Sequence, residues 1–131
     1  MIKKKYHDYA VEAFKLYGAI KQPKTEKMAD FRLKEYLLTR KMTLSDQQYT
    51  ATLDDIRACI RVIESIKKRK DADSILDALT VYTKFNYGHR SDISHAITRV
   101  SLNTFTSTMS IYRRLSLCRT LFATERGLCS A

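Results

Sequence analysis

Apolar residues recur along most of the chain at intervals of three and four positions, which is the periodicity of an amphipathic α-helix. The stretch 107–127 shows this pattern most fully. One face of the helix that it predicts is apolar and comprises Ile111, Leu115, Cys118 and Phe122. The opposite face carries Arg113, Ser116 and Thr120. Gly127 stands where a left-handed helix stop is favoured, so the stretch predicts a helix with one buried side and one side of arginine and small hydroxyls.

The same periodicity predicts five further helices. Their approximate ranges are 4–20, 25–41, 45–69, 72–85 and 91–102. Ser45 and Gln48 have the spacing of a capping box at the start of the third. The chain holds only three glycines and one proline, and its β-branched residues do not alternate with polar ones. The sequence therefore predicts an all-α protein of about six helices.

These helices divide into an N-terminal region, 1–70, and a C-terminal region, 71–131. In the C-terminal region two helices, a connection and a final helix follow one another, which is the layout of a tri-helical helix-turn-helix unit. The connection between the last two helices has no glycine, and we expect it to span five or six residues. On the final helix we expect Tyr112 and Phe122 in the core and Leu117 on the exposed arc. The N-terminal region would brace this unit, form an oligomer or bind RNA polymerase.

The expected helix 45–69 carries two apolar stripes and therefore needs two partners. The first is a seam with coiled-coil spacing, formed by Tyr49, Leu53, Ile56, Ile60 and Ile63. The second consists of Cys59, Val62 and Ile66. Packing within the chain is the favoured interpretation of the seam, and a homodimer through this helix is the alternative.

The formal net charge of +10 indicates a polyanionic partner, and its distribution refines that prediction. Residues 1–43 carry 11 basic and 5 acidic side chains, residues 44–87 carry 7 and 7, and residues 88–131 carry 6 and 2. All six basic residues of the last segment are arginines. Arginine binds guanine and phosphate with two parallel hydrogen bonds, which lysine does not. The sequence therefore predicts that the C-terminal region binds double-stranded DNA.

Several classes of protein are disfavoured. No run of about 18 apolar residues exists, and the charged N-terminus lacks the apolar segment of a secretory signal, so neither a membrane segment nor secretion is expected. Cys59, Cys118 and Cys129 include no CxxC pair and suit reduced thiols of a cytoplasmic protein. Glycine-rich phosphate loops, HExxH, GxSxG and Cys/His metal spacings are absent from the sequence. We therefore expect neither enzymatic activity nor a cofactor or metal.

Candidate DNA-binding residues follow from their positions on the last two helices. The expected base-reading residues are Arg113, Ser110, Ser116 and Met109. The expected contacts to the DNA backbone are Arg90, Ser91, Arg99, Ser107, Thr108, Arg114 and Arg119. Ser107 and Thr108 would bring the N-terminus of the last helix to a phosphate.

Two segments resemble a known family. The run SIYRRL at 110–115, with LFA at 121–123 and RGL at 126–128, is similar to the closing pattern of phage and prophage transcription regulators of the ArpU/RinA type. The opening stretch from Tyr9 to Tyr17 is similar to the start of its relatives. This sequence departs from the family pattern in having Arg114 where the family has an aromatic residue and Cys118 where it has alanine. The resemblance implies a sigma-factor-like DNA-binding activator of late genes that reads a promoter, with RNA polymerase as a second partner.

Two other classes stay open. One is an adaptor that binds RNA polymerase or a sigma factor without touching DNA. The other is a small phage packaging (terminase) subunit, in which helix-turn-helix units and oligomerising helices also occur together.

Overall fold

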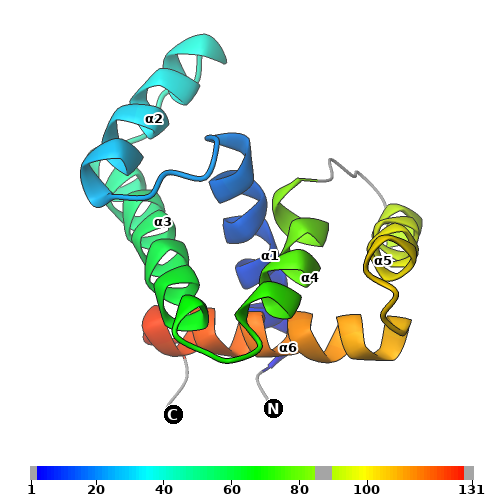
Figure 1. Ribbon diagram of the computed structural model, residues 1–131. Coiled ribbons are helices and arrows are strands. Elements are labelled where there is room, and N and C mark those ends of the chain that lie inside the picture. The colour runs from blue at the N-terminus through cyan, green and yellow to red at the C-terminus, as the bar shows by residue number, and fades with distance from the viewer. Residues whose placement is uncertain (1–2, 85–89, 129–131) are drawn as a thin grey trace.

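The computed structural model describes the backbone of residues 3–84 and 90–128, and the side chains of residues 3–84 and 93–128. Within these ranges every regular element is an α-helix (Figure 1). The helices are α1 (Lys4–Ala19), α2 (Glu26–Thr39), α3 (Asp46–Lys67), α4 (Ala72–Thr83), α5 (Arg90–Thr104) and α6 (Thr108–Glu125). The prediction of an all-α protein with about six helices is therefore confirmed. None of the helices in this part of the chain is long and apolar enough to cross a membrane.

Hydroxyl side chains fix the starts of three helices. The Ser45 hydroxyl accepts a hydrogen bond from the Gln48 backbone N–H at 3.1 Å, and the Gln48 side chain accepts one from the Ser45 N–H at 3.0 Å. These two bonds form the capping box that the sequence predicted. Thr25 caps α2 and Ser107 caps α6 in the same manner, each through its side-chain oxygen. Each cap satisfies a backbone donor that has no partner inside its own helix.

The connection between α5 and α6 is shorter than expected. α5 continues to Thr104, so only residues 105–107 separate it from α6, and the expectation of five or six residues is wrong. The Thr104 hydroxyl donates to the Val100 carbonyl at 2.7 Å, which places this polar residue in the last turn of the helix instead of in the loop. Phe105 then adopts the left-handed conformation, with φ +53°, that glycine usually supplies after a helix.

A single hydrophobic core draws on all six helices. Phe14 of α1 and Phe122 of α6 are fully buried, with ring centroids 5.7 Å apart. Leu33 of α2 and Ile97 of α5 are also buried in it. The described parts of the two expected regions, before and after residue 70, therefore share one core.

Both apolar stripes of α3 are used within the chain. The buried members are Leu53, Ile56 and Ile60 of the seam, with Cys59, Val62 and Ile66 of the second stripe. α3 packs against α2 and also against α1, α4 and α6. Packing within the chain, the favoured interpretation of the seam, is therefore correct, and the buried part of the seam is not accessible to a second subunit.

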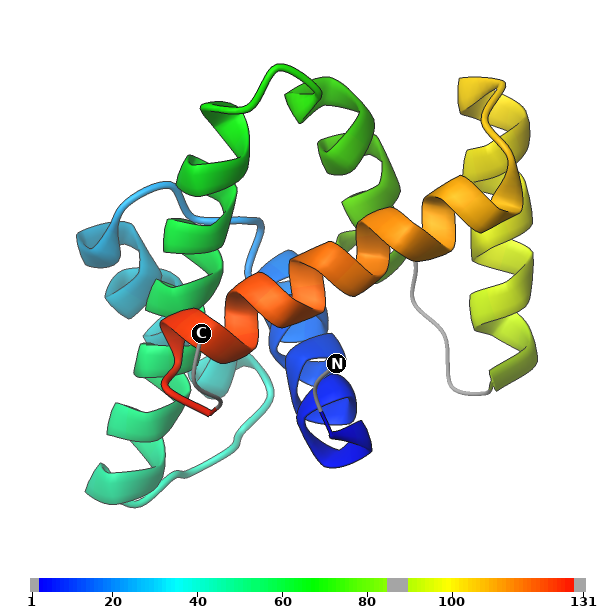
Figure 2. The ribbon, with the colours of Figure 1, turned by 90° about the horizontal axis from the view of Figure 1, so that it is seen from below.

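α6 lies across the base of α1, α3 and α4 (Figures 1 and 2). Two of these helices, α1 and α4, cross where Gly18 faces Thr83. A Cβ atom at Gly18 would lie 2.0 Å from the Thr83 carbonyl oxygen. Because glycine has no Cβ, the two helix backbones can approach this closely, and the pair forms much of the surface on which α6 packs.

Candidate nucleic-acid interface

The last three helices form a compact tri-helical unit. α4, α5 and α6 each pack against the other two. Figure 1 shows α5 nearly end-on while α6 lies along the page, so the two helices cross steeply after their three-residue turn. A short turn followed by a steep crossing is the arrangement of a helix-turn-helix unit, in which the final helix can enter the major groove of DNA.

The inner face of α6 has the residues that its periodicity predicted. The buried ones are Ile111, Leu115, Cys118 and Phe122, joined by Ala123. This face anchors α6 in the core. In the view from below, α6 runs in front of the other helices, so its outer face is turned to solvent (Figure 2).

The outer face of α6 brings together three of the four expected base-reading residues. Met109, Arg113 and Ser116 are exposed, one helical turn apart from each other. The Arg113 Nη2 atom lies 3.5 Å from the Met109 sulfur, and within the described chain the guanidinium makes no ion pair. Arg113 is therefore free to bind an external anion. Ser110 lies apart from this group: it is half-buried, and its Oγ accepts a hydrogen bond from the Ser107 hydroxyl at 3.0 Å.

The residues expected to contact the DNA backbone differ in their exposure to solvent. Thr108 is exposed at the start of α6, and Arg99 is exposed on α5. Arg114 is half-buried on the flank of α6. Arg90 and Ser91 begin α5, and their side chains lie outside the described residues. Ser107 is exposed, but its hydroxyl caps the helix, so only backbone N–H groups of the first turn stay available there for a phosphate.

Arg119, the remaining residue expected to contact the DNA backbone, is half-buried and makes its hydrogen bond within the protein. Its Nη1 donates to the Tyr82 hydroxyl of α4, and its Nε is buried without a hydrogen-bond partner. Burial, followed by the positive charge of Arg119, lowers the pKa of His7 on α1. Arg119 therefore links α6 to α4 in the structure.

Two expectations for single residues of α6 are wrong. Tyr112 is 50% exposed and lies beside Met109 and Arg113 on the outer face, although it was expected in the core. Leu117 is half-buried against the core, although it was expected on the exposed arc. The apolar stripe is broad enough to include Leu117 because α6 packs on helices on both flanks. Tyr112 instead stays half-exposed at a cavity that residues of α1 and α5 also line. Phe122, the other aromatic residue of this helix, is buried as predicted.

The start of α1 belongs to the same side of the molecule, and sequence reasoning missed it. His7 and Asp8 of α1 line a cavity of about 490 Å³ together with Tyr112 and Arg119 of α6. The exposed lysines that precede them, at positions 3–5, therefore lie near α6. Their clustering was visible in the sequence as part of the +6 charge of residues 1–43, but only the packing of α1 on α6 places that charge beside the interface.

Most of α5 and α6 carries no negative charge. Residues 93–124, which cover most of α5 and all but the last residue of α6, contain no aspartate or glutamate. The first acid after them, Glu125, is bound to Arg61 of α3 at 3.0 Å. Next to it, the Asp55 carboxylate of α3 accepts hydrogen bonds from Arg126 at 2.7 Å and from the Tyr9 hydroxyl at 2.7 Å. The acids at the far end of α6 therefore fix the helix to α3 and α1, whereas Asp8 of α1 lies at the cavity that Tyr112 and Arg119 also line.

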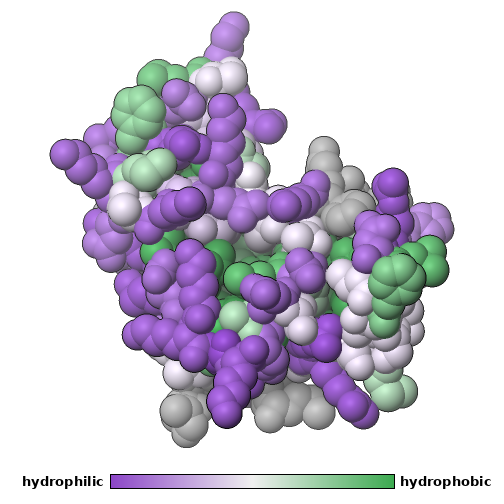
Figure 3. Space-filling view, in the orientation of Figure 1, coloured by the Kyte–Doolittle hydropathy of each residue, from purple (hydrophilic) through white to green (hydrophobic). Residues whose placement is uncertain are grey.

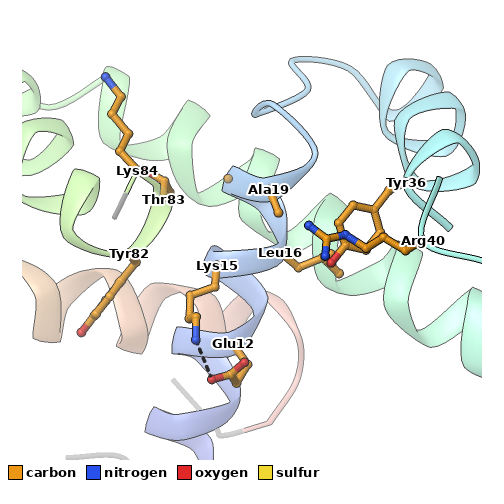
Figure 4. Close-up of a pocket in the computed structure, with 10 residues that line it drawn as sticks. Glu12, Lys15, Leu16, Ala19, Tyr36, Arg40, Tyr82, Thr83 and Lys84 are labelled. Atoms are coloured by element: carbon orange, nitrogen blue, oxygen red, sulfur yellow. Dashed lines mark ion pairs between the residues drawn. The ribbon is translucent and has the colours of Figure 1, made fainter. Parts of the chain in front are cut away.

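A second cavity lies elsewhere, between α1, α2 and α4 (Figure 4). It has a volume of about 670 Å³. Its lining includes an ion pair between Glu12 and Lys15 at 3.5 Å and the Arg40 guanidinium stacked on the Tyr36 ring at 4.6 Å. Its described lining residues include no histidine or cysteine, and in the part of the chain that the structure describes no group of three or more His, Cys, Asp or Glu side chains is placed to hold a metal ion.

Fold and surface together define an all-α protein whose last helix packs on α4 and α5 and presents an arginine and small polar groups to solvent. Comparison of the chain with protein-family models, with curated proteins and with solved structures finds no match. The resemblance to regulators of the ArpU/RinA type therefore stays a prediction from the quoted residues.

Proposed function

We propose that this protein binds double-stranded DNA through α6 and regulates transcription, as an activator of phage or prophage late genes. In this proposal the N-terminal half of α6 enters the major groove, with Arg113 reading a base edge and Met109 and Ser116 on either side of it. Arg99, Thr108 and the lysines at positions 3–5 contact phosphates. RNA polymerase is the second partner.

The observation that carries the proposal is the state of Arg113. Its guanidinium is exposed on a helix that crosses the preceding one steeply, and it has no carboxylate partner in the described chain. It also lies within 32 residues that contain no acid, 93–124. An uncompensated arginine on such a helix suits recognition of guanine or phosphate, because the planar guanidinium binds both with two hydrogen bonds.

The test begins with a random-sequence duplex library, from which the full-length chain selects its preferred site. Affinity for the recovered duplex is then measured by fluorescence anisotropy over a range of salt concentrations. Each neutralised phosphate releases counterions, so the logarithm of the binding constant should fall with the logarithm of salt by about 0.9 per phosphate contacted. If no duplex is enriched and none shifts at moderate salt, the chain is an adaptor that acts through protein contacts alone.

Arg113→Ala should weaken binding to the selected duplex by about 1–3 kcal/mol, the contribution of one bidentate base contact. The fold should be unaffected because the side chain is exposed. Arg40→Ala is the matched control: it removes one exposed arginine from the end of α2, which packs on α3 and away from α6 (Figure 1). Equal affinities of both variants and the unaltered protein would exclude Arg113 as a base-reading residue.

A further inference from the structure

The turn between α5 and α6 exposes large apolar side chains. Phe105 is 99% exposed, and its neighbours Leu102 and Met109 are 70% and 62% exposed. The space-filling view shows apolar surface over α5, separate from the apolar surface over α2 (Figure 3). Contiguous exposed apolar groups on a protein surface often mark a binding site.

Phe105 combines its exposure with an unfavourable backbone conformation. Its φ of +53° is a conformation in which bulky side chains are rare, and glycine occupies the equivalent position after α6, at Gly127. Lys21 and Lys41 adopt similar left-handed angles after α1 and α2. Their polar side chains gain hydration there, whereas Phe105 combines an unfavourable backbone with a ring fully in water. Backbone strain of this kind clusters at functional sites.

The turn holds the ring in a fixed place. The Thr106 N–H donates to the Ser101 carbonyl at 3.1 Å, and the Ser101 hydroxyl donates to the Thr106 carbonyl. The Thr106 hydroxyl donates to the Thr104 carbonyl at 3.1 Å. Because the flanking residues are bonded to each other and to α5, Phe105 projects from a closed loop and loses little freedom on binding.

The surroundings of this patch indicate what binds it. Phe105 lies within the acid-free range 93–124, and Met109, one helical turn further on, contacts the guanidinium of Arg113. An apolar group in an acid-free segment, with an arginine on the adjoining helix, complements nucleic acid, in which flat apolar base pairs are framed by phosphates. The patch also leads directly into α6 along the chain, since Phe105 comes three residues before the first residue of that helix.

We propose that Phe105 is an apolar wedge that inserts between two adjacent base pairs beside the groove that α6 enters, with Leu102 packed next to it. Such a wedge unstacks one base step and kinks the duplex. This inference rests on the proposed function, because it places the wedge by the position of α6 in the major groove. The wedge would make binding depend on how easily a base step is unstacked, in addition to the hydrogen bonds that Arg113 makes to a base.

The test compares Phe105→Asn and Phe105→Gly with the unaltered full-length chain. Asparagine and glycine both tolerate the left-handed backbone, so both variants remove the ring and keep the turn. The first readout is thermal unfolding followed by circular dichroism, in which both variants should be at least as stable as the unaltered chain. The second is affinity for the duplex recovered by selection, which should fall at least about fivefold, the low end of what one stacked base contributes. The third is fluorescence of 2-aminopurine placed at successive positions of that duplex, which should rise at one step with the unaltered chain and not with the variants.

Two further variants sharpen the result. Phe105→Trp keeps an aromatic wedge and should retain both the affinity and the 2-aminopurine signal. Phe31→Gln removes a ring that is 65% exposed on α2 and should change neither. If the unaltered chain binds the duplex and Phe105→Asn binds it equally tightly, the wedge is refuted while the proposed function stands, and the patch is then a protein-docking surface. If the unaltered chain binds no duplex, both proposals fall.

Discussion

Gly18→Ala tests the close crossing of α1 and α4, the two helices that form much of the surface on which α6 packs. The Cβ atom of an alanine at this position would lie 2.0 Å from the Thr83 carbonyl oxygen and 2.7 Å from the Thr83 carbonyl carbon and Cα. Since Cβ atoms essentially never approach another heavy atom within 3.0 Å, α1 and α4 would have to separate by about 1 Å. The obstructing atoms belong to the backbone, so no side chain can rotate out of the way.

The expected cost follows from two opposing effects. Forcing extra volume into a packed contact costs about 1–3 kcal/mol, and the backbone clash places this site at the upper end. Alanine regains about 0.5–1 kcal/mol over glycine inside a helix. We therefore expect a net loss of about 2 kcal/mol, which for a domain of this size lowers Tm by roughly 6–10 °C.

Thermal and urea unfolding followed by circular dichroism measure this loss. Gly127→Ala is the matched control, because a Cβ there meets nothing within 4 Å and only the φ of +73° opposes the change. That strain alone costs about 1 kcal/mol. If Gly18→Ala proved as stable as the unaltered chain, or less harmful than Gly127→Ala, α1 and α4 could not cross as closely as the structure has them.

Two further predictions concern the interior. Asp55→Asn removes the charged partner of the largely buried Arg126 and should lower the free energy of unfolding, measured in urea, by about 1–3 kcal/mol. Asp54→Asn, at a more exposed ion pair, is the control and should lower it by under about 1 kcal/mol. Equal losses in the two variants would contradict a special role for Asp55. Burial raises the pKa of two thiols, those of Cys59 and Cys118, the latter to about 12. A raised pKa keeps a thiol protonated and unreactive at pH 8. In the native Cys129→Ser variant, a thiol reagent should therefore label neither Cys59 nor Cys118 until urea unfolds the protein. Rapid labelling of the native variant would show that these two thiols are accessible.

The helices and their caps could be predicted from the sequence because they depend on residues close together in the chain. The capping box of Ser45 and Gln48 needs only a spacing of three residues, and the apolar stripe of α6 needs only helical periodicity. Arg113 lies opposite that stripe on a helical wheel, so its exposure also followed from the pattern. The net charge and its concentration in arginine near the C-terminus required no structure either.

Contacts between distant segments could not be predicted in this way. No feature of the neighbouring sequence indicates that Arg119 of α6 contacts Tyr82 of α4. The sequence analysis therefore grouped Arg119 with the arginines that were expected to contact the DNA backbone. The close crossing of α1 and α4 at Gly18 could not be predicted either, because a glycine near the end of a helix is also explained by helix termination.

The sequence by itself determined the six helices, their amphipathic faces and the positive charge, since periodicity, capping and composition are properties of neighbouring residues. Only the tertiary structure decided which faces are covered: it buried the seam of α3 within the chain, turned Tyr112 outward and Leu117 inward, and left Phe105 in solvent at a three-residue turn. The physical reason is that burial depends on how helices far apart in the chain cross, and these crossings are set by the packing of all six helices together.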